Sequence, residues 1–292
     1  MFRITQRSMA DTTYTNLQAS LARSSSLQEQ LSSGKQISRP SDSPAGANDV
    51  MQLKAQRATT AQFVRNADNG IAWLDTADGA LQLSSARMVR ARELTVAGAN
   101  GAMSATSRNA LAAELQGVRD SIIELANVQY LGRPVFGGTT AGAVAFDPTT
   151  GAYVGDSGSV QRRVGAESTV QVDVDGVSAF GSGPGGIIAT LDAVISDLRL
   201  NRSTQSHLTA VDASHQQLLG ALSDVGARTN RIENLKAKAD DAGIMLRSAQ
   251  SQIEDVDLPK AILELQMQTV AYQAALGATA RVLQPTLLDF LR

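Results

Sequence analysis

Hydrophobic residues recur at steps of three and four through most of this chain, which is the spacing of one face of an α-helix. The first such segment carries four leucines, Leu17, Leu21, Leu27 and Leu31. Gly34 follows them at the position of a helix C-cap, and Pro40 and Pro44 each disfavour helical backbone at the preceding residue. The pattern predicts a helix that ends near Gly34, followed by a break.

A long second helix is predicted from about Ala45. Its seam positions follow heptad-like spacing and are Val50, Leu53, Thr60, Val64, Ala67, Ile71, Leu74, Leu81 and Met88. Arg57 and Asp78 interrupt this seam. A further amphipathic helix follows with Leu111, Leu115, Val118, Ile122 and Leu125. We expect it to fold back on the long helix.

The composition changes from about Val135, where Gly, Thr, Val and Asp become more frequent and the helical period disappears. Val170, Val172 and Val174 alternate before Asp175-Gly176, which is typical of a strand that enters a hairpin turn. The segment ends in GSGPGG, residues 181–186. This region is predicted to be a small β-rich insert.

Helical spacing returns at Ile187 and continues to the end of the chain, with a break at Pro259. The seam before this break comprises Leu218, Leu222, Val225, Thr229, Ile232, Ala239, Leu246, Ile253 and Val256. The seam after it comprises Ile262, Leu265, Thr269, Tyr272, Leu276, Thr279 and Leu283. The predicted fold is mainly α, an elongated rod of heptad-patterned antiparallel helices from both chain ends with a small β-rich middle domain.

The terminal helices carry narrow apolar stripes, which they cannot bury alone. Each stripe must therefore pair with the other terminus, with another subunit, or with both. This requirement points to a protein that assembles.

Composition narrows the function further. The 292 residues are 43% hydrophobic but only 4% aromatic, which suits thin helical seams better than a bulky core. The formal net charge of −2 gives no field that favours nucleic acid, and no segment has the length and hydrophobicity of a membrane helix. Because cysteine is absent, disulfides, thiolate metal sites and cysteine nucleophiles are excluded. The N-terminus shows no cleavable signal peptide.

Short motifs suggest no catalytic, cofactor or metal site. Gly181, Gly183 and Gly186 match a dinucleotide-binding turn, but no second parallel strand with an acidic residue follows. Ser32 and Lys35 have the spacing of a serine nucleophile and its lysine, without companion motifs. The two histidines, His207 and His215, lack a third ligand. An enzyme or nucleotide-binding module in the Gly-rich middle remains an alternative, which a nucleotide titration would test.

Longer motifs at both ends resemble the flagellin family. At the N-terminal side these are LSSGKQISRPSDSPAGA (31–47), NADNGIAWLDTADGAL (66–81) and RARELTVAGANG (90–101). At the C-terminal side they are RSAQSQIEDVD (247–257) and the final LLDFLR. The segment 132–151 and the RPSDSPAGA form of the first break are most similar to the hook-associated protein 3 branch of that family.

The resemblance implies a structural, non-enzymatic subunit without cofactors, exported by the flagellar type III apparatus. It would be an extracellular adaptor at the hook-filament junction, between hook-associated protein 1 and the flagellin filament, and would be needed for filament assembly and motility. The implied partners are those two proteins, copies of itself in a ring, and an export chaperone at the C-terminal segment, but not nucleic acid or the membrane interior. The alternative is a short flagellin that forms the filament itself.

The resemblance also implies three parts. Residues 1–44 and 258–292 would form terminal coiled-coil core segments, residues 45–134 and 187–257 a helical rod domain, and residues 135–186 an outward-facing insert. The implied assembly interface comprises Leu17, Leu21, Leu27, Leu31, Ile262, Leu265, Tyr272, Leu276, Leu283, Leu287, Leu288 and Leu291.

Overall fold

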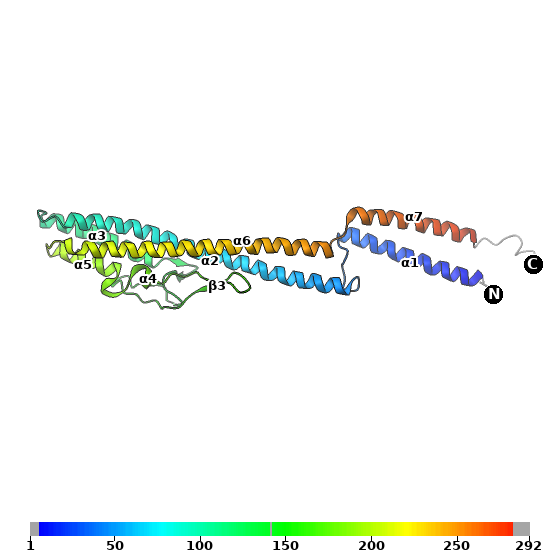
Figure 1. Ribbon diagram of the computed structural model, residues 1–292, viewed down its shortest axis with the longest axis horizontal. Coiled ribbons are helices and arrows are strands. Elements are labelled where there is room, and N and C mark those ends of the chain that lie inside the picture. Colours follow the sequence, from blue (N-terminus) through cyan, green and yellow to red (C-terminus); the bar gives the residue numbers. More distant parts are fainter. Residues whose placement is uncertain (1–5, 141, 283–292) are drawn as a thin grey trace, which may run out of the picture. The chain divides into compact units, whose positions relative to one another are not determined.

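The structure is a computed structural model that describes residues 6–140 and 142–282 (Figure 1). The chain forms two compact units: unit 1 comprises residues 1–58 and 243–292, and unit 2 comprises residues 59–242. Helices α2 (Pro44–Gly98) and α6 (Leu208–Glu254) each contribute residues to both units. The mainly α-helical fold is confirmed, whereas the three-part division at residues 44, 134, 186 and 257 stays a prediction.

Unit 1 is built around two antiparallel helices, α1 (Gln6–Ser33) and α7 (Leu258–Val282), which lie side by side in Figure 1. Their direction follows from two contacts: Gln268 of α7 bonds to Ser20 of α1, and Lys35 pairs with Asp255 in an isolated antiparallel bridge. Gly34 ends α1 with a φ of +69°, which a residue without a Cβ adopts at little cost. The predicted C-cap at Gly34 is therefore confirmed.

Unit 2 packs α3 (Ala105–Ala126) and α5 (Ile187–Arg199) against the remaining parts of α2 and α6. Its buried residues include two heptad series, one on α2 and one on α6. The series are Ala67, Leu74, Leu81, Met88 and Thr95, and Val211, Leu218, Val225, Ile232 and Ala239. The predicted seams of the long helices are thus confirmed within this unit.

Helix α2 also carries small residues that admit close neighbours. A Cβ at Gly98 would lie 2.6 Å from Cδ2 of Leu198 and 3.0 Å from Oγ1 of Thr204. The Thr204 hydroxyl donates to the Thr95 carbonyl oxygen at 2.6 Å. The C-terminal turn of α2 therefore touches both the end of α5 and the segment between α5 and α6, at a point where a larger side chain would not fit.

The segment between α3 and α5 has two antiparallel hairpins and a core of its own aromatic side chains. Strands β1 (Gln129–Tyr130) and β2 (Arg133–Pro134) form one hairpin, and β3 (Gln161–Arg163) and β4 (Thr169–Gln171) form the other. The Phe180 ring lies 5.0 Å from Phe136 and 5.6 Å from Phe146, both edge to face. These buried rings compensate for strands of only two or three residues.

The predicted hairpin turn at Asp175-Gly176 is wrong. Asp175 is instead the N-cap of the short helix α4 (Gly176–Phe180), and its carboxylate accepts from the backbone N–H groups of Val177 and Ser178. Asp is favoured at both turns and N-caps, so the dipeptide alone does not distinguish them. The 3₁₀ turn η1 (Gly183–Gly185) follows, and another, η2 (Gln205–His207), precedes α6. In the described part of the chain no helix could span a membrane.

Candidate assembly interface

The α1 surface that faces α7 is a heptad stripe of half-buried residues, including three of the predicted leucines. The stripe is Thr13, Leu17, Ser20, Ser24, Leu27 and Leu31. Leu21 does not belong to it, because it is 57% exposed. The prediction of Leu21 as a seam residue is not matched in the α1–α7 pair, where the half-buried residue three positions after Leu17 is Ser20.

The facing stripe of α7 has the same period. It consists of Ala261, Leu265, Gln268, Tyr272, Ala275 and Thr279. The Gln268 amide donates to Oγ of Ser20 at 2.8 Å and to its carbonyl oxygen at 3.3 Å. We call these two stripes the seam. The sequence pattern predicted Leu265, Tyr272 and Thr279 of the α7 stripe, but it did not predict Ala261, Gln268 or Ala275.

The predicted interface residues therefore divide into three groups. Leu17, Leu27, Leu31, Leu265 and Tyr272 lie half-buried in the seam, and Leu21, Ile262 and Leu276 are exposed beside it. The rest, Leu283, Leu287, Leu288 and Leu291, lie outside the described residues. Whether any of them contacts another subunit stays a prediction.

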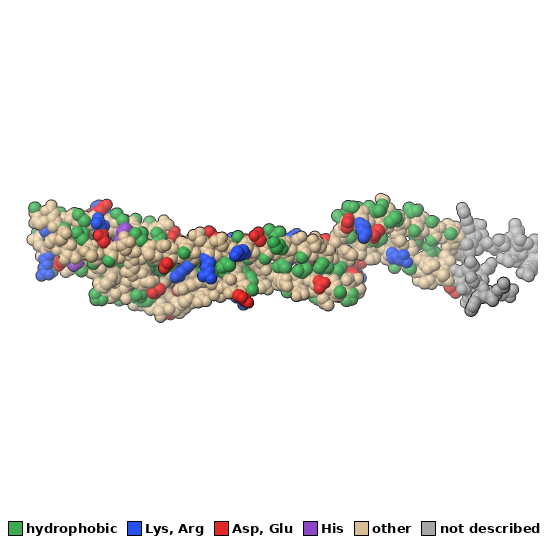
Figure 2. All heavy atoms as spheres, viewed as in Figure 1, with side chains coloured by type: hydrophobic (Ala, Val, Ile, Leu, Met, Phe, Trp, Pro, Cys, Tyr) green, Lys and Arg blue, Asp and Glu red, His purple; other side chains and the backbone are tan. Residues whose placement is uncertain are grey.

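Helix α7 has a second apolar stripe on the side away from α1. Leu263 and Met267 each lie two positions from Leu265, which is about 200° around a helix, and both are 57% exposed. Val270 continues this stripe and is 65% exposed. We call Leu263, Met267 and Val270 the outer stripe, and Figure 2 shows hydrophobic side chains along this helix. The described residues of unit 1 leave it exposed.

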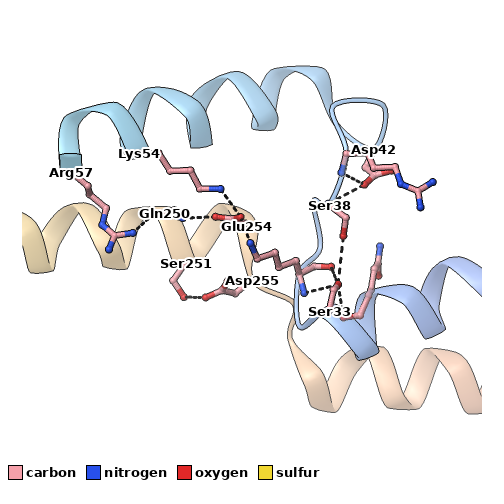
Figure 3. Close-up of polar contacts among 12 residues, drawn as sticks. Ser33, Ser38, Asp42, Lys54, Arg57, Gln250, Ser251, Glu254 and Asp255 are labelled. Atoms are coloured by element: carbon pink, nitrogen blue, oxygen red, sulfur yellow. Dashed lines mark hydrogen bonds and ion pairs between the residues drawn. The ribbon is translucent and has the colours of Figure 1, made fainter. Parts of the chain in front are cut away.

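A buried carboxylate joins the segments where α1 and α6 end. Glu254, the last residue of α6, is 4% exposed, and its Oε1 accepts from the ammonium groups of Lys35 and Lys54 at 2.8 Å each. The other oxygen, Oε2, accepts from the Gln250 amide, which in turn is held by Arg57. Figure 3 shows Glu254 between Lys54, which projects from α2, and the loop that follows α1.

Backbone hydrogen bonds strengthen this junction. The N–H of Gln36 donates to the Glu254 carbonyl oxygen at 2.7 Å, and the N–H of Val256 donates to the Gly34 carbonyl oxygen at 3.0 Å. Burial raises the pKa of Glu254, but the hydrogen bonds from Lys35, Lys54 and Gln250 outweigh it and lower that pKa to about 2. The carboxylate is therefore ionised at neutral pH and holds the α6–α7 break against the loop after α1.

The glycines of 181–186, the Ser32–Lys35 pair and the two histidines occupy positions that capping, ion pairing and hydrogen bonding explain. Gly181 caps the end of α4 and Gly186 caps the start of α5, so a helix precedes the glycines where a dinucleotide-binding turn requires a strand. Lys35 pairs with Glu254, and Ser32 is exposed. The histidines contact different residues: His207 pairs with Asp197 at 2.8 Å, and His215 bonds to Ser85 at 2.9 Å.

Two family models match most of the chain. Residues 4–141 match the bacterial flagellin N-terminal helical region, and residues 208–291 match the bacterial flagellin C-terminal helical region. The chain belongs to the bacterial flagellin family. It is accordingly a structural protein of the flagellum. The first matched region contains α1 and the second contains α7, the two helices that form the seam.

Relatives of two kinds are similar to this flagellin-family protein over more than nine-tenths of its length. Flagellar hook-associated protein 3 of Salmonella typhimurium is 27% identical over 94% of each chain, and flagellin of Bacillus subtilis is 28% identical over 97% of this chain and 96% of its own. The two identities differ by one percentage point. Percent identity therefore establishes the family without choosing between its branches.

Solved structures confirm the fold. A flagellar hook-associated protein from Vibrio parahaemolyticus matches with a TM-score of 0.68 and 22% identity, and covers 73% of this chain and 100% of its own. FlgL from Bacillus cereus matches with a TM-score of 0.61 and 20% identity, and covers 68% of this chain and 99% of its own.

Proposed function

We propose that this flagellin-family protein is the hook-filament junction subunit, placed between hook-associated protein 1 and the flagellin filament. It acts as a mechanical adaptor and carries out no covalent chemistry. Its contacts are with those two proteins and with copies of itself in a ring, and an export chaperone covers its C-terminal segment before assembly.

The observation that carries the assembly part of this proposal is the outer stripe of α7. Three large hydrophobic side chains, Leu263, Met267 and Val270, are each more than half exposed on one face of a helix. Their spacing of four and three residues is that of a coiled-coil seam. An apolar stripe of this kind is the anchor pattern of a helix that docks against another helix.

The choice of the junction over the filament rests on the segment 132–151 and its resemblance to the hook-associated protein 3 branch, because flagellin matches over as much of the chain as hook-associated protein 3 does. This segment, which includes β2 and the chain that follows it, is the part in which the sequence is most similar to that branch. The terminal helices do not help with this choice, because both branches share them.

The first experiment is electron microscopy of cells that lack this gene, together with an assay for flagellin released into the medium. The proposal predicts bare hooks and abundant free flagellin, because exported flagellin that has no junction to assemble on is released into the medium. Bare hooks without released flagellin would instead identify this chain as the filament protein. Normal filaments would contradict both functions.

A matched pair of variants then tests the outer stripe in the same cells. Val270→Asp should fail to restore filaments, since a carboxylate at a helix interface is costly to bury. Gln266→Asp is the control, because Gln266 is an exposed polar residue outside both stripes of the same helix. Equal restoration by both variants would remove the outer stripe from the interface.

A further inference from the structure

The β1–β2 hairpin displays a leucine at its tip in an unfavourable backbone conformation. Leu131 has a φ of +50° and the following Gly132 a φ of +77°. Such two-residue turns favour Asn, Asp or Gly, and a leucine in the left-handed region is uncommon. Leu131 is also 79% exposed, more than any other large hydrophobic residue in the described part of the chain. A residue that is both strained and exposed points to a contact made elsewhere.

Three arginines of strands β2 and β3 lie over aromatic rings of α2. The guanidinium carbons of Arg133 and Arg162 lie 5.9 and 6.0 Å from the centre of the Trp73 ring, and that of Arg163 lies 5.9 Å from the Phe63 ring. We call Arg133, Arg162 and Arg163 the arginine face. None of them forms an ion pair with a described carboxylate.

Uncharged partners hold the arginine face in position: besides the aromatic rings, Arg162 donates to the Asn69 side chain and Arg163 to the carbonyl oxygens of Gly165 and Ala166. Asp156 is an acidic group within the field of Arg133, but hydrogen bonds from Thr139 and Gly158 already engage its carboxylate. Cation-π contacts orient a guanidinium without neutralising it. The arginine face and Leu131 together therefore fit an acidic surface with an apolar centre.

Such a surface lies on the other side of α2. Asp75 is two residues after Trp73, which is about 200° around the helix, so it points away from the arginine face. Asp75 and Leu83 are exposed, Leu83 at 57%, and a Cβ added at Gly79 between them would meet nothing within 4 Å. Neither Asp75 nor Asp78 forms an ion pair with a described residue. We call Asp75, Asp78, Gly79 and Leu83 the acidic face.

We propose that Leu131 and the arginine face of one copy dock onto the acidic face of the next copy of this chain. Because the two faces lie on different sides of α2, the contact is head to tail, and repeated rotation of this kind can close a ring. The inference rests on the proposed function only in assuming that copies stand side by side. The charges are complementary, and the glycine leaves room for the leucine beside Leu83.

Cysteine cross-linking tests the contact directly, because the chain contains no cysteine of its own. Flagella isolated from cells that carry Leu131→Cys and Leu83→Cys in one chain are oxidised and separated without reductant. We expect a ladder of linked copies from the double variant and monomers from either single variant. Dimers from Leu131→Cys alone would mean a symmetric contact and overturn the proposal. Incorporation of the double variant without a ladder would overturn it as well.

A charge exchange gives an independent test should the cysteine variants not assemble. Arg133→Glu and Asp75→Arg should each reduce incorporation into flagella at least threefold, and the two together should return it to within twofold of the unchanged chain. Arg199→Glu, at an exposed arginine of α5 outside both faces, should have no effect. Harmless single changes or a double variant that is not rescued would contradict the contact.

These outcomes are separable from those of the deletion experiment. If the chain formed the filament instead of the junction, the ladder would still appear, because copies would still be neighbours. If deletion left bare hooks and free flagellin but no ladder formed, the function would stand and only the assignment of the two faces would fail.

Discussion

Replacing Glu254 by glutamine removes the charge at the junction of unit 1 with little change in shape. The pKa of this carboxyl is lowered from 4.5 to about 2, and each pKa unit corresponds to about 1.4 kcal/mol, so the shift corresponds to about 3 kcal/mol. The side chains of Lys35 and Lys54 are 46% and 48% exposed, so solvent screens both ion pairs. After this discount we expect Glu254→Gln to destabilise the junction by about 1 to 2 kcal/mol.

Hydrogen exchange at two amides measures this loss where it occurs. The N–H groups of Gln36 and Val256 bond across the junction to the carbonyl oxygens of Glu254 and Gly34. A loss of about 1 to 2 kcal/mol should make both exchange about 5 to 30 times faster. The side-chain substitution keeps the main-chain carbonyl oxygen of residue 254, which accepts from the Gln36 N–H. Faster exchange would therefore report opening of the junction and not a missing acceptor.

Glu29→Gln is the matched control. Glu29 pairs with Arg39 at 2.6 Å, but the two side chains are 49% and 67% exposed. An exposed pair of this kind contributes about 0 to 1 kcal/mol, so exchange at Gln36 and Val256 should change little. Equal effects of the two substitutions, or no effect of Glu254→Gln, would refute the reasoning that burial makes Glu254 the stronger of the two.

Three further predictions concern pH, core packing and a buried cation. Because the pKa of Glu254 is lower in the folded chain, the stabilisation by its carboxylate is complete above about pH 4.5 and is lost as the pH falls towards 2. Protection of the Gln36 amide from hydrogen exchange should fall over the same pH range. In Glu254→Gln this pH dependence should be absent. Leu115→Ala removes a side chain with 0% exposure in unit 2 and should lower the free energy of unfolding by about 2 to 5 kcal/mol. The measurement is denaturant unfolding followed by Trp73 fluorescence. Ala113→Gly, at an exposed position of the same helix, is the control and should lower it by about 1 kcal/mol. Arg108→Leu should lower the free energy of unfolding by more than about 2 kcal/mol in the same assay. Arg108 is 4% exposed, and its guanidinium donates to three carbonyl oxygens that would lose a partner. An unchanged unfolding midpoint would show that water replaces the guanidinium.

The long helices were predictable because their period is carried by the residues themselves. Leu74, Leu81 and Met88 repeat every seven positions on one helix, and Leu218 and Val225 do so on another, so spacing alone identified the buried sides. The start of α1 at Gln6 was not predictable in this way, since residues 6–16 are mostly polar and give no apolar period.

The seam and the junction of unit 1 show where sequence patterns stop being informative. Ser20 and Gln268 lie at seam positions that a hydrophobicity pattern assigns to solvent, and their hydrogen bond joins residues 248 positions apart. Glu254 and Lys35 are 219 positions apart, and nothing near either residue in the sequence marks it as a partner. Both features depend on the antiparallel pairing of chain ends, which only the folded structure specifies.

The hydrogen bond between Gln268 and Ser20 also fixes how far the two helices can slide along each other. A shift by one heptad would keep the stripes facing, but it would place Gln268 opposite Leu27 or Thr13 and separate it from Ser20. In the first case a glutamine amide would lie against a leucine without an acceptor, at a cost of about 1 to 3 kcal/mol. A force along the axis of this pair must therefore break the Gln268–Ser20 hydrogen bond before the helices can shift by one heptad. The two helices are expected to stay in one register up to that force and then to shift in a single step.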